Sequence, residues 1–138
     1  MTQASAAGSA TLAQAKPKSS PRGLSFPRFF TARMPADGTP YDDLQWEIRC
    51  ASIANDKGEI MFEQRDIEVP ADWSQTATNI VASKYFHGPP GSPERESSVA
   101  QLVRRVTGAI AEWGWAGGYF KTREDALNFR DELAHLTL

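Results

Sequence analysis

The sequence predicts an α+β fold, mainly α-helical, in which a β-hairpin is followed by about three helices. Two patterns carry this prediction: apolar residues alternate with a period of two before residue 64, and they recur at spacings of three and four after residue 70. A chain of 138 residues makes one domain at most. We therefore expect a single modest core.

The first 25 residues differ in composition from the rest. They are rich in Ala, Ser, Gln, Lys and Pro, so they bury too little apolar surface to offset the entropy lost on ordering. We interpret residues 1–25 as a disordered tail and 26–138 as the folded domain. A transit peptide is a weaker interpretation, because the early part lacks arginine and an amphipathic face. Three aromatic residues between Phe26 and Phe30 indicate a segment that packs against the domain.

The predicted hairpin lies between residues 46 and 63. Its turn is Asn55-Asp56-Lys57-Gly58, in which Gly58 supplies the positive φ that such turns commonly require. The second strand alternates through Ile60 and Phe62. One face of the first strand consists of Trp46, Ile48, Cys50 and Ser52.

A first helix follows Pro70. Asp72 is placed to cap its amino end, and His87-Gly88 marks its expected end. Its apolar face consists of Trp73, Ala77, Ile80 and Val81.

The strongest helical pattern covers residues 97–113, and we interpret Glu94 and Glu96 as its acidic start. Six apolar side chains on one face would contribute on the order of 10 kcal/mol if fully buried, so this domain or another must cover them. They are Val99, Leu102, Val103, Val106, Ile110 and Trp113.

A last helix is predicted over residues 123–137. A glycine-rich turn from Trp113 to Gly118 precedes it, and Thr122 with Asp125 forms a variant of the capping box. Its apolar stripe consists of Ala126, Phe129, Leu133 and Leu136. The pattern still runs at Leu138, so we expect a domain that is incomplete at its carboxyl end.

Charge and cysteine content exclude several classes. Residues 37–138 carry ten basic and seventeen acidic side chains, a net charge of −7, which disfavours direct nucleic-acid binding by the folded part. The basic tail is the only candidate for such a contact. A single cysteine rules out an internal disulfide, and no apolar run approaches the roughly 20 residues of a membrane span. We expect a cytoplasmic protein without membrane contact.

Local motifs offer little chemistry. His87, His135 and Cys50 are too far apart in sequence to indicate a metal site, and Cys50 is interpreted as a small apolar core residue rather than a nucleophile. The glycines of the 113–118 turn lack the context of a phosphate-binding loop. We therefore predict no catalytic, cofactor-binding or metal-binding residues. The weak candidates for ligand or partner contacts are Lys84, Tyr85 and Arg105.

Several short motifs together resemble the N-terminal region of class II, adenosylcobalamin (vitamin B12)-dependent ribonucleotide reductases. The resemblance spans about residues 26–138 and is densest over 70–86, Pro-Ala-Asp-Trp-Ser-Gln-Thr-Ala-Thr-Asn-Ile-Val-Ala-Ser-Lys-Tyr-Phe. The other matching motifs are Tyr41-Asp42-Asp43, Trp46-Glu47-Ile48-Arg49, Asn55 with Gly58, Phe62-Glu63-Gln64, Glu68-Val69-Pro70, Glu96 with Ser97 and Val99, Arg105-Val106, Gly118-Tyr119-Phe120, and Phe129 with Glu132-Leu133.

This resemblance implies a cap that precedes a ten-stranded α/β barrel absent from the chain. In that family, adenosylcobalamin generates a thiyl radical in the barrel, and ribonucleotides are reduced to deoxyribonucleotides for DNA synthesis and repair. The implied partners are the barrel of the same or a companion chain, a ribonucleotide substrate (a diphosphate by resemblance), a nucleotide effector and a dithiol reductant. The segment is expected to be inactive alone and not to bind the cofactor by itself.

A second hypothesis is a free-standing, non-catalytic interaction module that binds a reductase barrel or a nucleotide. Such a module should bury its own apolar stripes and unfold cooperatively, whereas a fragment should expose them.

Overall fold

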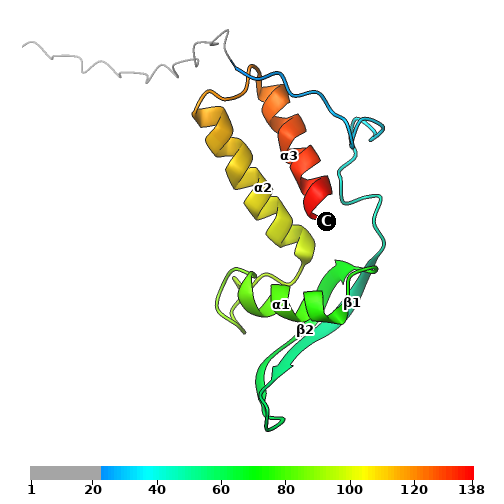
Figure 1. Cartoon of the computed structure of the whole chain (residues 1–138), viewed down its shortest axis with the longest axis vertical. Coiled ribbons are helices and arrows are strands. Elements are labelled where there is room, and N and C mark those ends of the chain that lie inside the picture. Colours follow the sequence, from blue (N-terminus) through cyan, green and yellow to red (C-terminus); the bar gives the residue numbers. More distant parts are fainter. Residues whose placement is uncertain (1–22) are drawn as a thin grey trace, which may run out of the picture.

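The computed structural model describes residues 23–138. Its two strands and three helices follow in the order β1, β2, α1, α2, α3, which confirms the predicted hairpin followed by three helices. Figure 1 shows α2 and α3 side by side, the hairpin at the far end from their connecting turn, and the N-terminal segment running along α3. The tail predicted over residues 1–25 lies outside the described residues except for Gly23, Leu24 and Ser25.

The two strands pair antiparallel and are joined by the predicted turn. β1 spans Trp46–Ala54 and β2 spans Ile60–Pro70. The Asn55 side-chain oxygen accepts backbone N–H bonds from Lys57 at 3.0 Å and Glu59 at 2.9 Å, and Gly58 has a φ of 82°. Asn55 and Gly58 therefore close the hairpin, as the sequence predicted.

A β-bulge interrupts the hairpin halfway along. The register shifts between Arg49 and Ala51, so that Cys50 opposes two residues of β2. One of them, Asp66, has a φ of 56°, a conformation that few residues other than glycine adopt. The bulge lets both halves of the hairpin keep their pairing.

The buried face of β1 is opposite to the predicted one. Ile48 is 63% exposed and Cys50 is also exposed, so the prediction that Cys50 is a core residue is wrong. Ala51, on the other face, is fully buried. The reason is that α1 packs on the side of Ala51, whose small side chain permits a close approach, and Arg49 binds the backbone at the entrance to α1.

Helix α1 spans Gln75–Lys84. Its N-cap is Ser74, whose hydroxyl accepts the Ala77 N–H at 3.1 Å, and not Asp72 as predicted. The Trp73 N–H donates to the Pro70 carbonyl, and this turn places Asp72 before the helix. The helix ends three residues before the predicted His87, where Tyr85 caps it.

Helix α2 spans Val99–Ala116 and begins at Ser98, whose hydroxyl accepts the Ala100 N–H and donates to Glu68 of β2. Glu94 and Glu96 therefore precede the helix and do not form its first turn as predicted. Near the carboxyl end of α2, the Phe120 ring packs against Gly114. A Cβ at position 114 would lie only 2.5 Å from this ring, so the position requires glycine.

The predicted apolar stripe of α2 is covered mainly in its first half. Val99 and Val103 are buried, whereas Val106 and Ile110 are each 38% exposed and Trp113 is 72% exposed. The described residues cover the second half only in part. We call Val106, Ile110 and Trp113 the α2 stripe.

Helix α3 spans Arg123–Thr137, and its capping box is confirmed: Thr122 and Asp125 exchange hydrogen bonds between side chain and backbone. Of the predicted stripe, Ala126 is buried and Leu136 is 65% exposed. Phe129 stacks edge-on against Phe26 of the N-terminal segment, at 5.3 Å between ring centroids. The segment from 26 to 30 thus packs against the domain as predicted.

The core lies where the hairpin, α1 and α2 meet. Ile67 and Val69 of β2 and Val99 of α2 have no exposed surface. The other buried members of this cluster are Tyr41, Ala51, Ala82, Phe86, Ala100, Val103 and Ala134.

Candidate functional site

Two of the three predicted contact residues meet at the carboxyl end of α1. Arg105 of α2 donates from Nη2 to the Tyr85 carbonyl at 3.1 Å and from Nε to Glu96 Oε1 at 2.7 Å. Lys84 is the exposed last residue of α1, and its ammonium has no side-chain partner among residues 23–138. A cation at this end of a helix interacts favourably with the helix dipole.

The environment of the Arg105–Glu96 ion pair favours the charged form of both side chains. Burial acts to raise the pKa of Glu96, but the hydrogen bonds from Arg105 and from the His87 N–H outweigh it, and the pKa is lowered. The pKa of Arg105 is raised mainly by the same hydrogen bond. Both groups stay charged at neutral pH, so the arginine is engaged in joining α2 to the loop after α1.

Sequence reasoning missed Arg95, which organises the same region. Its Nη1 donates to the carbonyls of Phe86 at 2.7 Å and Gly88 at 2.9 Å, and its Nε donates to the Gln64 side chain at 3.0 Å. Nη2 binds the Ala82 carbonyl. Carbonyls at a helix end lack partners within the helix, and Arg95 binds one of these, that of Ala82, together with two carbonyls of the loop that follows α1. No periodic pattern includes Arg95, because its contacts depend on how the loop folds back.

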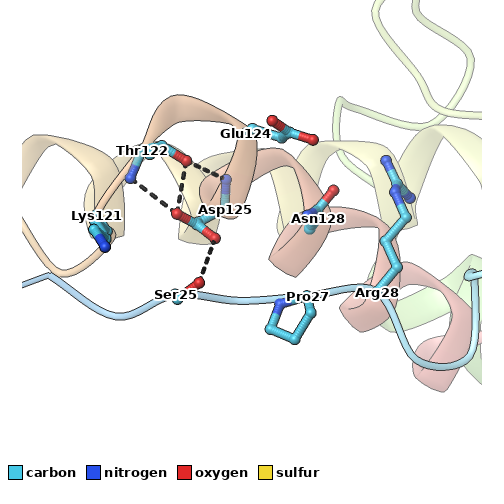
Figure 2. Close-up of a pocket in the computed structure, with 8 residues that line it drawn as sticks. All are labelled: Ser25, Pro27, Arg28, Lys121, Thr122, Glu124, Asp125 and Asn128. Carbon is cyan, nitrogen blue, oxygen red and sulfur yellow. Dashed lines mark hydrogen bonds between the residues drawn. The ribbon is translucent and has the colours of Figure 1, made fainter.

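A second polar junction joins the N-terminal segment to the start of α3 (Figure 2). Asp125 accepts the Phe26 N–H at 2.7 Å through one oxygen and the Thr122 hydroxyl at 2.6 Å through the other. The pKa of Asp125 is lowered, first by the Thr122 hydroxyl and then by the Phe26 N–H. The Leu24 N–H also donates to the Tyr119 carbonyl at 2.8 Å.

The open hollow in Figure 2 is therefore no anion site. Lys121 and Arg28 line it, but Glu124 and Asp125 line it as well. The capping box already engages the N–H groups of Thr122 and Asp125 at the start of α3, where an anion would bind. The hollow is the rim of a structural junction.

About two turns further along α3, two more buried carboxylates hold the same segment. Glu132 accepts the backbone N–H groups of Phe30 and Thr31, each at 2.8 Å, and the Thr31 hydroxyl at 2.5 Å. Asp131 pairs with Arg28 at 2.8 Å. Burial acts to raise the pKa of Glu132, but the Thr31 and Phe30 hydrogen bonds outweigh it and lower the pKa.

The part of the chain that the structure describes contains no cluster of three or more His, Cys, Asp or Glu side chains placed to hold a metal ion. Within residues 23–138, no helix is both long and apolar enough to cross a membrane. Cys50 stands exposed on the hairpin beside the bulge.

Comparison with known proteins decides the family. The family model described as "Class II vitamin B12-dependent ribonucleotide reductase" matches residues 47–138. The chain belongs to this reductase family. The match begins at β1 and includes the hairpin and all three helices, and the resemblance found in the sequence motifs is thereby confirmed.

Three relatives of the family carry the name vitamin B12-dependent ribonucleotide reductase. The protein of Rhodopirellula baltica is 50% identical over 118 residues, which is 84% of this chain and 11% of that protein. The Streptomyces coelicolor protein is 39% identical over 134 residues, 96% of this chain and 14% of that protein. The Agrobacterium fabrum protein is 33% identical over 129 residues, 70% of this chain and 10% of that protein. The chain thus spans a small fraction of these relatives.

Proposed function

We propose that the chain is the N-terminal part of a cytoplasmic, adenosylcobalamin-dependent ribonucleoside-diphosphate reductase, and that it caps a catalytic barrel supplied by the same or a companion chain. The observation that carries this proposal is the family match over residues 47–138 in a chain that spans only 10–14% of the three relatives above. The remaining length of such a reductase has room for the barrel, the substrate site and the effector site.

The α2 stripe is proposed to form the contact surface between this chain and that barrel, which we call the joint. Its three side chains point along one face of a well-formed helix, and they stay exposed although Val99 and Val103 of the same stripe are buried. Contiguous exposed apolar surface of this kind marks contact surfaces. Lys84 and the 61%-exposed Tyr85, which lie at the helix end that Arg105 binds, are proposed to contact the same partner or its ligand.

The isolated chain is expected to be inactive. A dithiol-driven reduction that also uses a thiyl radical requires several cysteines, and the chain has only Cys50. Hollows of about 540, 480 and 340 Å³ lie among the described residues; the two larger of these are open surface, and none of the three offers the enclosed site that a corrin needs. The described residues do not fit cobalamin, so the cofactor belongs to the remainder of the reductase.

The joint is tested by association. The R. baltica reductase without its matching segment would be mixed with the chain and analysed by sedimentation velocity. We expect a one-to-one complex that Ile110→Glu abolishes. Gln101→Glu adds the same charge to the same helix, where an acid near the amino end is tolerated, and should leave the complex intact. Failure of the wild-type chain to bind, or equal binding by Ile110→Glu, would refute the joint.

The second hypothesis, a free-standing module, has one observation in its favour. Ile67, Val69 and Val99 are completely buried within the described residues, so the chain has a core of its own. A module of this kind would unfold cooperatively and would bind a barrel or nucleotide without supporting turnover in a complete reductase. The exposed α2 stripe favours the first proposal.

A further inference from the structure

A second cavity lies between α2, α3 and the segment before β1, beside the Arg28–Asp131 ion pair. Its volume is about 340 Å³. Thr39 and Tyr41 line it from the N-terminal segment, Arg104 and Gly108 from α2, and Arg130 and Asp131 from α3. None of these contacts is used by the family assignment or by the proposed joint.

The cavity is cationic in a domain that is acidic overall. The Arg104 guanidinium lies 4.4 Å from the centre of the Tyr41 ring and has no hydrogen bond or ion pair to any other residue between 23 and 138. Arg130 pairs with Asp131 at 2.9 Å, but the other oxygen of Asp131 is bound by Arg28 at 2.8 Å. One carboxylate is shared by two arginines, and Arg104 adds a third positive charge. The local balance is therefore positive.

Neutral donors complete the lining. The Thr39 hydroxyl oxygen is buried and has no hydrogen-bond partner among the described residues. Buried hydroxyls are rarely left without one. Burial raises the pKa of Tyr41, so its phenol remains protonated and able to donate. A Cβ on Gly108 would meet no atom within 4 Å, which shows that the helix wall leaves space here.

We propose that this cavity binds a phosphate group, either inorganic phosphate or the phosphate of a nucleotide. A guanidinium fork matches phosphate oxygens geometrically, and Arg104 is held ready by its stacking on Tyr41. Phosphate also offers enough oxygens to accept from Arg104, Arg130 and the Thr39 hydroxyl together. The proposal is independent of the joint at the α2 stripe, because it uses other residues.

Nuclear magnetic resonance titration of the whole 138-residue chain tests the site. Adding inorganic phosphate at constant ionic strength should cause saturable shifts of the Thr39, Tyr41 and Gly108 amides. Arg104→Gln should weaken binding by about tenfold or more, through loss of charge-assisted hydrogen bonds. Arg65→Gln removes the same charge from an exposed position on the hairpin and should leave the affinity unchanged.

A second variant guards against indirect effects. Gly108→Leu adds a side chain at the cavity wall without removing any charge, and it should also prevent saturation. ATP in place of phosphate separates the two sources: equal affinity assigns the site to phosphate alone, and affinity at least tenfold tighter assigns it to a nucleotide. Linear shifts without saturation, or equal weakening by Arg104→Gln and Arg65→Gln, would overturn the proposal.

Discussion

Replacing Glu132 with alanine is expected to destabilise the domain strongly. The carboxylate is 5% exposed and accepts three hydrogen bonds from Phe30 and Thr31. A hydrogen bond to a charged group contributes about 1.5–3 kcal/mol, and a buried donor left unpaired costs about 1–3 kcal/mol. The three bonds share one carboxylate and are not additive, so we expect a loss of about 2–4 kcal/mol. That is a large share of the roughly 5–15 kcal/mol by which domains are stable.

Urea unfolding followed by tryptophan fluorescence measures this loss. Glu132→Gln keeps one acceptor oxygen and should fall between wild type and Glu132→Ala. Glu124→Ala is the matched control, since it removes the same charge from an exposed position in the first turn of α3. If Glu132→Ala and Glu124→Ala have the same unfolding midpoint, the carboxylate does not anchor the N-terminal segment and the reasoning fails.

Three further predictions concern acid unfolding, two arginines and the α2 stripe. The pKa values of Asp125 and Glu132 are lowered in the folded state. Their contribution to the free energy of unfolding is therefore fully present above the unfolded carboxyl pKa of about 4, and it is lost as the pH falls through their folded pKa values. Acid unfolding curves should show this, and Glu132→Gln should flatten them. Arg95→Gln should lower the free energy of unfolding, measured in urea, by about 2–4 kcal/mol. Arg105→Gln should lower it by about 1 kcal/mol or less, because the Arg105–Glu96 ion pair is more exposed. Equal losses for the two variants would contradict this prediction. Trp113→Ser should change the stability of the isolated chain by no more than about 0.5 kcal/mol in the same assay.

The order of the elements could be predicted because each has a strong local signal. Helical spacing, the Asn55–Gly58 turn and the Thr122–Asp125 capping box all depend on residues close in sequence, and all are present in the structure. The buried face of β1 was predicted wrongly because alternation shows that a strand has two faces but not which one a helix covers. Ala51 is a weaker apolar signal than Ile48, yet its small size decides where α1 packs.

The polar contacts could not be predicted for a similar reason. Arg95 and Glu132 bind backbone groups of segments that are remote in sequence or connected by irregular loops. Their partners are N–H and C=O groups, which every residue carries, so residue type gives no indication of the pairing. Arg105 was predicted as a ligand or partner contact, whereas its observed hydrogen bonds join α2 to the loop after α1.

The most direct test of the proposed function is turnover by a chimeric reductase. The R. baltica reductase would be assayed for vitamin B12-dependent reduction of ribonucleotides in three forms: intact, without the segment that matches this chain, and with the chain in its place. We predict that deletion abolishes turnover and that replacement restores it. Full activity of the deleted form, or a folded chimera that remains inactive, would contradict the proposal that this chain is the N-terminal part of such a reductase.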